Sequence, residues 1–589
     1  MHSSENFHTD VLVVGSGPMG ATTALALATY GVRVQVVNRY NWTANTPRAH
    51  ITNQRAAEVL RDLGVEADAR RDATPWEWMG DTLFTTSLAG PEIARLRTWG
   101  TGDERIGDYL QGSPCPMLDL PQNKMEPILV QQAAARGAVF SWNTQYLGHV
   151  QDAHGVTVSL RDLNDGREYA VRARYLVGAD GARSKVMDDA GLAVEGQLAR
   201  AATAYVLFKA DLTRYAAHRP SILYWIVTSN AAFGEIGMGL LRAIEPWKQW
   251  IAGWGFDPSQ GEPDFSPEEI LHKVRILTGV PDLEIEIDST SVWYVNQAHA
   301  PVYSQGRVFC GGDAVHRHPP SSGLGSNTCM QDAFNLAWKL AFVVKGYAGA
   351  SLLDSYTLER APVGAQVVAR ANQSRLDYAP LNQCFRDKSA PDPVAAGLAQ
   401  LADPGPAGVQ RRAALADALK LKNYEFNAQG VELNQRCVSA AVLPDAEGGE
   451  EVWRRDPQLY LQATTRPGAK LPHAWLVARD GHRTSTLDVV GRGQFSLVTG
   501  LAGQAWVQAA EALARPFLRT VVIGAPGAQD VYCAWQAVRE IDEAGALLVR
   551  PDGVVAWRQH QGAATALQAQ QTLAQALDQI LGQATAPGA

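Results

Sequence analysis

Residues 9–20, TDVLVVGSGPMG, decide the fold of the amino-terminal part of the chain. The apolar run that ends at Val14 predicts a short buried strand, and the alanine-rich residues 18–30 predict the helix that follows it. Gly31 ends that helix, and VRVQVV at 32–37 predicts the next strand. Together these segments predict a βαβ unit.

The turn of this unit carries a Gly-x-Gly-x-x-Gly motif between a strand and a helix, which is the context that dinucleotide binding requires. Gly15 permits a tight turn, Gly17 lets a pyrophosphate approach the backbone, and Gly20 permits close packing of helix on strand. The alternative is a structural glycine turn without a ligand. The residues expected to bind the dinucleotide here are Gly15, Ser16, Gly17, Pro18, Met19 and Gly20.

The acidic residue that often binds a ribose at the end of the second strand is missing, because the strand ends Val37-Asn38-Arg39. Asn38 can bind a hydroxyl group, and Arg39 can stack on or pair with the AMP half of a nucleotide, unless Arg39 is simply a solvated loop residue. A second glycine cluster at 491–493 precedes the strand-like QFSLVTG rather than a helix. A single nucleotide-binding fold is therefore expected.

The composition excludes several classes of protein. The 589 residues are 46% hydrophobic and 19% charged, which is enough for a large folded core. A net charge of −8 leaves no excess of Lys and Arg to neutralise phosphates, so a general nucleic-acid binder is not expected. The N-terminus lacks the pattern of a signal peptide, and charges interrupt the apolar stretch 331–350, so no membrane association is expected.

The six cysteines are scattered and none forms Cys-x-x-Cys, which argues against a disulfide scaffold, a zinc ribbon or a thioredoxin-type redox pair. We therefore expect a reducing, cytoplasmic location. His316 and His318 form His-x-His, but no third ligand lies nearby in the sequence, so no metal site is expected.

Length alone, at about 150 residues per domain, predicts three or four domains. Composition predicts a discontinuous nucleotide-binding domain of residues 1–195 and 296–385, interrupted by a sheet-rich domain at 196–295. Proline and glycine at 386–410 predict a linker, and residues 411–589 predict a further α/β domain. Within that domain, GALLVRPDGVVAWR predicts a hairpin.

Two further motifs follow predicted strands. The segment 177–184, VGADGARS, includes Asp180, and the segment 311–316, GGDAVH, includes Gly312 and Asp313. The Asp313 carboxylate can accept hydrogen bonds from ribityl or ribose hydroxyl groups. The glycine-rich loop that follows opens a helix and offers backbone N–H groups to an anionic ring. The loop residues expected to contact the cofactor are Pro320, Gly325, Ser326 and Asn327.

These three motifs in this order resemble those of the class A flavoprotein aromatic hydroxylases. Within that class, the chain is most similar to the single-component phenol hydroxylases that act on 2,4-dichlorophenol or 2-hydroxybiphenyl. The similar segments cover essentially the whole chain and include SPCPMLDLPQNKMEP, LYWIV, GVELNQR, TRPGAKLPH and residues 312–340.

The resemblance implies an α/β protein with a Rossmann-like FAD-binding domain, a β-sheet substrate domain and a C-terminal thioredoxin-like domain. In this family FAD is reduced by NADH or NADPH and reacts with O2 to a C4a-hydroperoxide, which hydroxylates a small phenol ortho to its hydroxyl group and gives a catechol. The family also implies a homodimer. A free phenol has a pKa of about 10, so a base near its hydroxyl group is expected.

The resemblance also implies roles for particular residues. His50 is expected to be the base or hydrogen-bond partner of the phenol, with Asp119 in the same polar network. The alternatives are a core histidine, and an N-cap of the helix that begins at Pro121. The other positions implied are Arg48 and Gln122 at the flavin or its pyrophosphate, and Trp225 and Arg242 on the sheet over the flavin, where Trp225 has plain core packing as its alternative.

Two rival functions remain open from the residues. One is a flavin hydroxylase of a larger polyketide or quinone, or of a hydroxyphenyl acid, which would need a dedicated cation in the pocket; Arg242 is the candidate. The other is a non-catalytic FAD-binding or thioredoxin-like interaction protein, against which His50, Asp119 and the intact 311–316 motif argue.

Overall fold

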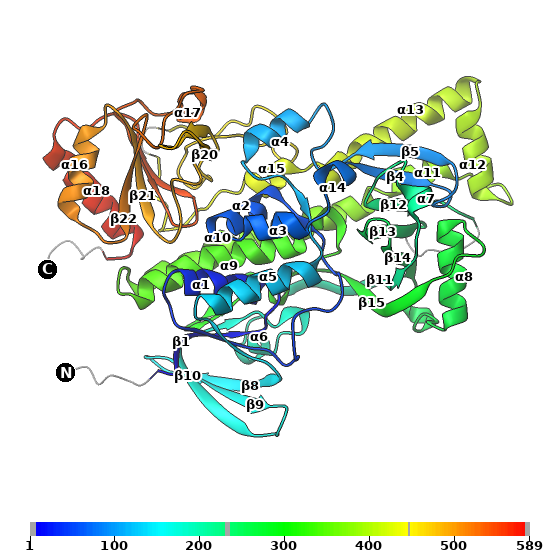
Figure 1. Ribbon diagram of the computed structural model, residues 1–589, viewed down its shortest axis with the longest axis horizontal. Coiled ribbons are helices and arrows are strands. Elements are labelled where there is room, and N and C mark those ends of the chain that lie inside the picture. Colours follow the sequence, from blue (N-terminus) through cyan, green and yellow to red (C-terminus); the bar gives the residue numbers. More distant parts are fainter. Residues whose placement is uncertain (1–6, 230–235, 446–447, 584–589) are drawn as a thin grey trace.

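The computed structural model describes residues 7–229, 236–445 and 448–583. Within these residues the chain builds two sheets of eight strands and one of four. Figure 1 shows the first sheet below a layer of helices, the second sheet at the right, and the carboxyl-terminal domain at the upper left. None of the helices described combines the length and the apolar character that crossing a membrane requires.

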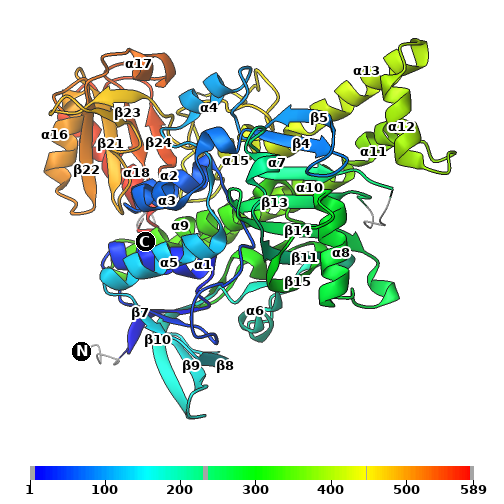
Figure 2. The same cartoon turned by 45° about the vertical axis from the view of Figure 1, so that its right-hand side comes forward.

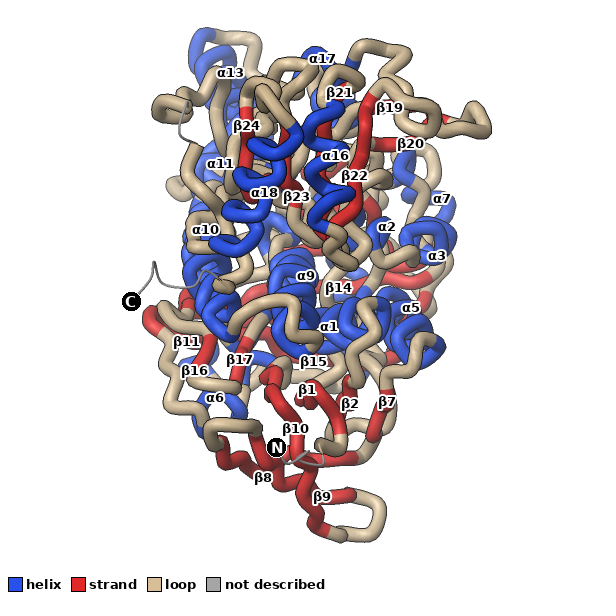
Figure 3. Tube along the Cα trace, turned by 90° about the vertical axis from the view of Figure 1, so that its left-hand side faces the viewer, coloured by secondary structure: helices blue, strands red, loops and turns tan. Residues whose placement is uncertain are grey.

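The first sheet contains the predicted βαβ unit. Strand β1 (Thr9–Val14) pairs in parallel with β2 (Val34–Val37), and α1 (Pro18–Thr29) connects them. All six residues of β1 are buried, as expected of a central parallel strand. Helix α1 packs against α5 (Gln122–Ala135) and α9 (Gly325–Val344), which form the helical layer above the sheet in Figure 3. The other strands of this sheet are β7 (Val139–Ser141), β8 (Thr144–Gln151), β9 (Val156–Asp162), β10 (Glu168–Gly178), β16 (Ser304–Gln305) and β17 (Val308–Cys310).

The second sheet forms most of the region predicted to be rich in strands. In spatial order its strands are β18 (His316–Arg317), β15 (Glu286–His299), β11 (Glu195–Lys209), β14 (Gln249–Phe256), β13 (Gly239–Glu245), β12 (Leu223–Ile226), β4 (Asp81–Thr85) and β5 (Glu92–Arg97). Helix α8 (Pro267–Thr278) contacts β13.

The predicted boundaries of this region, 196–295, are too narrow. Figure 2 shows β4 and β5 in one sheet with β13 and β14, although the sequence prediction placed residues 81–97 in the nucleotide-binding domain. Strand β4 pairs in parallel with β12, a partner far away in the sequence. Sequence patterns report local periodicity and carry no information about such a distant partner.

The segment 386–410 is not the linker that its proline and glycine content predicted. It contains α12 (Pro393–Ala402) and the start of α13 (Pro406–Leu421), which follow α10 (Ser355–Leu376) and α11 (Ala379–Phe385). Two of its four prolines, Pro393 and Pro406, lie in the first turn of a helix, where their missing N–H group costs nothing. These helices pack against the edge of the second sheet through Val394, Leu415 and Phe84.

The carboxyl-terminal domain is built on a four-stranded sheet with the order β22 (Leu518–Ile523), β21 (Phe495–Gly500), β23 (Ala546–Val549), β24 (Val555–Gln559). Strands β21 and β22 are parallel, and β23 and β24 form the predicted antiparallel hairpin. Figure 3 shows α16 (Gln504–Leu513) and α18 (Ala566–Ile580) side by side on one face of this sheet. The predicted α/β fold class, with its FAD-binding and carboxyl-terminal domains, is confirmed.

Shorter elements connect these regions. They are α2 (Gln54–Asp62), α3 (Glu66–Asp72), α4 (Ile106–Gly112), α6 (Lys185–Asp189), α7 (Thr213–Ala216), α14 (Asn423–Phe426), α15 (Gln429–Leu433), α17 (Ala534–Val538), β3 (Ile51–Thr52), β6 (Leu118–Asp119), β19 (Trp475–Val477) and β20 (Arg483–Ser485).

Five of the six cysteines are shielded from solvent. Cys115, Cys310, Cys329 and Cys384 are buried, Cys437 is half-buried, and Cys533 is exposed. Burial raises the pKa of Cys437 to about 12, and it likewise raises the pKa of the four buried thiols.

A single hydrophobic core crosses from the first sheet into the carboxyl-terminal domain. Trp338 of α9 is fully buried, and its ring lies 5.7 Å from the ring of Phe495 at the start of β21. Both residues belong to the cluster that also contains Val11 and Leu12 of β1. The two domains therefore share apolar contacts and are expected to unfold together.

We expect Trp338→Ala to lower the stability of the whole chain by about 3–5 kcal/mol, the usual cost of such a cavity. The measurement is thermal unfolding followed by circular dichroism, with limited proteolysis of each domain as a second readout. Trp453→Ala, at a tryptophan that is 37% exposed, is the matched control and should leave Tm nearly unchanged. Early release of an intact carboxyl-terminal domain alone would contradict the shared core.

Candidate functional site

His50 and Asp119 lie on neighbouring backbone segments that a short antiparallel ladder joins. Strands β3 and β6 pair with Ile51 opposite Asp119. The ladder continues on either side, since the Leu120 N–H group donates to the carbonyl oxygen of His50 at 2.7 Å. Two residues that are far apart in the sequence are therefore fixed relative to each other by backbone hydrogen bonds.

The side chain of Asn327 ties this ladder to the glycine-rich loop. Its Oδ1 accepts from the Asn53 N–H group at 2.9 Å, and its Nδ2 donates to the carbonyl oxygen of Ile51 at 2.7 Å. Asn327 is fully buried at the start of α9. Its side chain thus serves protein contacts, so any contact with a cofactor at this position falls to its backbone.

Asp119 forms an ion pair with Arg242, which projects from β13 of the second sheet. Arg242 Nη2 donates to Asp119 Oδ1 at 2.5 Å, and the Asp119 side chain is fully buried. Burial raises the pKa of Asp119, and Arg242 opposes that shift only in part. Asp119 does not cap α5, because Gln122 begins that helix and its N-cap residue Pro121 offers no side-chain hydrogen bond.

His50 is buried beside this pair. Burial and the charge of Arg242 hold its pKa well below the ordinary value, so the imidazole is neutral. Its Nδ1 has no hydrogen-bond partner among the described residues, and neither has Asp119 Oδ2. Two buried polar atoms are thus left for a bound molecule, which argues against reading His50 as a satisfied core histidine.

An apolar cluster adjoins these polar groups. Ile51, the cross-strand partner of Asp119, and Leu223, the partner of Arg242, both belong to it. The other members are Met79, Trp99, Tyr109, Met117, Ile222 and Phe426, with Trp76, Leu96, Trp225 and Leu240 packed at its edge. Such walls suit an aromatic ring.

Trp225 joins this cluster to a second one. Its ring lies 4.7 Å from that of Tyr378, and it also packs with the cluster around Phe84 and Phe385. These contacts describe a packing residue at the edge of the apolar wall. Its expected part in flavin movement stays a prediction.

The glycine motif has the geometry that its sequence predicted. Gly15 has φ +100°, and a Cβ atom there would lie 2.3 Å from the carbonyl oxygen of Ala179. A Cβ atom on Gly20 would collide with the Gly15 carbonyl oxygen at 1.9 Å. At Gly17, by contrast, a Cβ atom would meet only Glu126 Oε1, at 3.8 Å, so this face of the turn is open to a pyrophosphate.

The side chains around this turn hold one another in place. Asn38 Nδ2 donates to Ser16 Oγ at 2.5 Å. Gln122 Nε2 donates to Glu126 Oε1 at 2.5 Å, and Glu126 Oε2 accepts from the Ala44 N–H group at 2.7 Å. The sequence analysis missed Glu126, whose signal was its position one helical turn after Gln122. Burial raises its pKa.

Two predicted cations of the site lie at the chain segment after β2. Arg48 donates to Thr46 Oγ1 at 3.3 Å, and its charge opposes a small part of the rise that burial causes in the pKa of Glu126. The Arg39 guanidinium lies 4.8 Å from the ring centre of the exposed Tyr40. Neither arginine has a carboxylate partner among the ion pairs of the described residues, so both are available to phosphate or adenine.

The two aspartates predicted at the cofactor differ in their surroundings. Asp180 accepts from Ser184 Oγ at 2.5 Å and from the Val186 N–H group, which uses both carboxylate oxygens in the turn before α6. Asp313 is exposed, and its carboxylate accepts only a long contact from Cys329 Sγ at 3.8 Å among the described residues. Asp313 is therefore the better placed of the two to accept hydroxyl groups of a ligand.

Backbone donors complete this part of the site. Gly325, Ser326 and Asn327 open α9, so their N–H groups have no acceptor within the helix. Pro320 is exposed at the start of the same loop, and the Gly312 N–H group donates to Asp332 Oδ2 at 3.1 Å. An open glycine turn, a free carboxylate and a helix N-terminus fit the pyrophosphate, ribityl chain and ring of FAD.

His316 and His318 have protein partners. His316 Nε2 is 2.9 Å from Asp332 Oδ2, and His318 Nδ1 is 2.8 Å from the carbonyl oxygen of Pro319. Burial and His316 lower the pKa of His318 to about 4. No group of three or more His, Cys, Asp and Glu residues suited to a metal occurs in the described ranges.

Comparison with known proteins identifies the family. Residues 8–371 match the model of the FAD binding domain, and residues 464–584 match that of the aromatic-ring hydroxylase C-terminal domain. The 2,4-dichlorophenol 6-monooxygenase of Cupriavidus pinatubonensis is 49% identical over 584 residues, which cover 98% of this chain and 96% of the relative. The phenol 2-monooxygenase of a Pseudomonas species is 44% identical over 93% of this chain and 90% of its own length.

A solved structure agrees with these relatives. The flavin-dependent monooxygenase PieE, in complex with FAD and substrate, superposes with a TM-score of 0.93 at 41% identity and covers 98% of this chain and 99% of its own. The resemblance noted in the sequence is confirmed. The chain belongs to the FAD-dependent aromatic-ring hydroxylases, flavoprotein monooxygenases that use NAD(P)H and O2.

Proposed function

We propose that this enzyme hydroxylates a small, uncharged phenol at the carbon next to its hydroxyl group. The reaction consumes one phenol, one O2, one NAD(P)H and one proton, and yields a catechol, water and NAD(P)+. The names of the relatives, 2,4-dichlorophenol 6-monooxygenase and phenol 2-monooxygenase, support this substrate class.

The observation that carries the proposal is the pairing of Arg242 with Asp119 at 2.5 Å. A hydroxyphenyl acid would need a free cation for its carboxylate, and Arg242 was the cation that the sequence offered. Because its guanidinium is already neutralised beside an apolar wall, the site favours a phenol without a carboxylate. The unpartnered polar atoms of His50 and Asp119 then face a hydroxyl group rather than an acid.

Different residues of the chain accept the phenolic proton, orient the hydroxyl group and hold FAD. Bound FAD supplies the reductive activation of O2. Asp119 accepts the phenolic proton at its free Oδ2, because burial raises the pKa of this carboxyl and makes it the stronger base, whereas the pKa of His50 is lowered. His50 orients the hydroxyl group by donating from Nδ1–H to the phenolic oxygen, so the two side chains do not compete for its one proton. The residues proposed to hold FAD are those of the glycine turn, Arg39, Arg48, Gln122, Asp313 and the first residues of α9.

Incubation with ¹⁸O2, NADH plus NADPH and a panel of phenols tests the proposal. The panel contains chlorophenols, 2-hydroxybiphenyl, resorcinol and hydroxyphenyl acids, and the products are analysed by mass spectrometry. We expect a singly labelled catechol from a phenol that carries no carboxylate. Labelled product from a hydroxyphenyl acid alone would overturn the substrate class.

Asp119→Asn should slow hydroxylation by about 10²–10⁴-fold, the usual contribution of a positioned base. The loss should shrink for phenols of low pKa, which are already ionised at the assay pH. Asp81→Asn is the control. It removes a similarly buried carboxylate, which pairs with Arg95 at 2.8 Å in the sheet that carries Arg242. An equal loss for acidic and weakly acidic phenols would argue against Asp119 as the proton acceptor.

His50→Ala should slow hydroxylation at saturating phenol by about 2- to 10-fold, which corresponds to the loss of one hydrogen bond. FAD should stay bound, as judged by the flavin absorbance of the purified protein. A loss as large as that of Asp119→Asn, with the same dependence on phenol pKa, would move the role of base to His50.

Asp313→Ala should weaken FAD binding by about 10- to 100-fold, because a charge-assisted hydrogen bond to the cofactor is lost. The dissociation constant is measured by titrating the apoprotein with FAD and following flavin fluorescence. Asp165→Ala, at an exposed carboxylate between β9 and β10, should leave it unchanged. Unaltered affinity in Asp313→Ala would remove this residue from the cofactor site.

A further inference from the structure

Helix α2 is bonded along one face to the carboxyl-terminal domain. It begins directly after β3, the strand that follows His50, and Asn53 caps it by accepting from the Ala56 N–H group. Three charged residues of the helix face that domain. Arg55 donates to the Asp552 carbonyl oxygen at 2.7 Å, Glu58 pairs with Lys470 at 2.7 Å, and Arg61 pairs with Asp488 at 2.6 Å.

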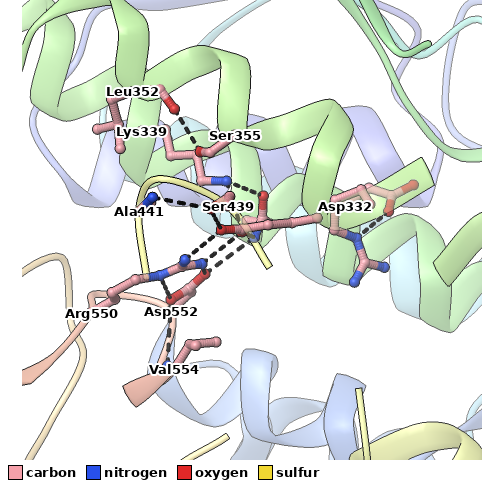
Figure 4. Close-up of polar contacts among 12 residues, drawn as sticks. Asp332, Lys339, Leu352, Ser355, Ser439, Ala441, Arg550, Asp552 and Val554 are labelled. Atoms are coloured by element: carbon pink, nitrogen blue, oxygen red, sulfur yellow. Dashed lines mark hydrogen bonds and ion pairs between the residues drawn. The ribbon is translucent and has the colours of Figure 1, made fainter. Parts of the chain in front are cut away.

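A second contact joins the same domain to α10. The Arg550 guanidinium is fully buried, and it donates to the two carboxylate oxygens of Glu359 at 2.6 and 2.9 Å. Lys339 of α9 reaches the same carboxylate at 2.9 Å. Figure 4 shows the side chains of Arg550, Asp552, Lys339 and Ser439 gathered at this junction. Two cations and the two carboxylates of Glu359 and Asp552 balance one another away from water.

Arg360, the residue after Glu359, is linked through Asp332 to the 311–316 segment. Arg360 Nε donates to Asp332 Oδ1 at 2.7 Å. The other oxygen of Asp332 accepts from the Gly312 N–H group, and it lies 2.9 Å from His316 Nε2. Asp332 thus holds the 311–316 segment that includes Asp313, and Arg360 holds Asp332. Arg360 lies on α10, and the residue before it, Glu359, pairs with Arg550 of the carboxyl-terminal domain.

We propose that Arg550, in the turn between β23 and β24, is a positioning residue for the FAD-binding loop and acts through Glu359, Arg360 and Asp332. The sequence assigned this turn only the role of closing a hairpin. The inference rests on FAD binding by this family and does not depend on the proposed phenol.

The physical reason is the geometry of the pair. A guanidinium bound to both oxygens of Glu359 fixes the rotation of α10 at this turn, which a point charge does not do. Without Arg550, Glu359 and Asp552 present two buried carboxylates to Lys339 alone, and relief of this imbalance requires α10 to move. Any such movement is passed to Arg360, because it is the next residue on the same helix.

Four full-length variants test this role: Arg550→Lys, Arg550→Gln, Glu359→Gln and the double variant with both glutamines. The readout is the FAD dissociation constant of each apoprotein, together with the visible spectrum of the bound flavin. We expect affinity to fall by about 2- to 30-fold in each single variant, the range found for coupling through a packed network. In the double variant the losses should be less than additive.

Leu547→Ala is the matched control. Leu547 is fully buried in the core of the carboxyl-terminal domain and lies on β23, the strand that leads to Arg550. It should lower Tm as Arg550→Lys does and leave FAD affinity unchanged. If Arg550→Gln does not fold, Arg550→Lys and Glu359→Gln decide the matter.

Two results would overturn the inference. One is wild-type FAD affinity in folded Arg550→Lys and Glu359→Gln, and the other is an equal loss of affinity in Leu547→Ala. Arg55→Ala, on the α2 contact, should keep FAD affinity. The FAD measurements need no substrate, so a failure of the phenol proposal leaves them fully interpretable.

Discussion

The organisation of the site depends on one buried amide. Asn327 bonds the backbone on both sides of Thr52, and it does so from the first turn of α9. A carbonyl oxygen accepts and an amide donates, so both groups of the side chain are used and no other residue type of similar size supplies both. The strand that follows His50 and the helix that follows the glycine-rich loop are thereby held as one unit.

Around this unit, charge is balanced rather than concentrated. Asp119 is neutralised by Arg242, and Glu359 by Arg550 and Lys339, so each of these two buried carboxylates meets a guanidinium or ammonium group. Pairing of this kind adds little to the free energy of unfolding. Moving one partner away is costly, because it leaves the other charge buried and unpaired. The site gains geometric definition from it, and the aromatic substrate meets atoms whose positions are set before it binds.

Local rules explain what the sequence could predict. The βαβ unit, the glycine turn and the β23–β24 hairpin depend on residues within one short window, and each was found where predicted. The pairing of Asp119 with Arg242, the Asn327 bridge and the Arg550–Glu359 contact join residues that are far apart in the chain. No periodicity encodes such partners. The linker prediction at 386–410 was wrong because proline was read as a breaker, whereas it begins two helices there.

The distribution of thiols has a consequence for the proposed reaction, whose product is a catechol. Catechols oxidise in air to ortho-quinones, which are electrophiles that alkylate thiolates. Among the described residues, Cys533 alone is exposed, and burial raises the pKa of the other five thiols, so those remain unreactive. Cys533 follows Tyr532 in the carboxyl-terminal domain, outside the apolar cluster beside His50 and Asp119. A quinone formed in solution therefore meets one accessible sulfur among the described residues, and that sulfur lies outside the proposed substrate site.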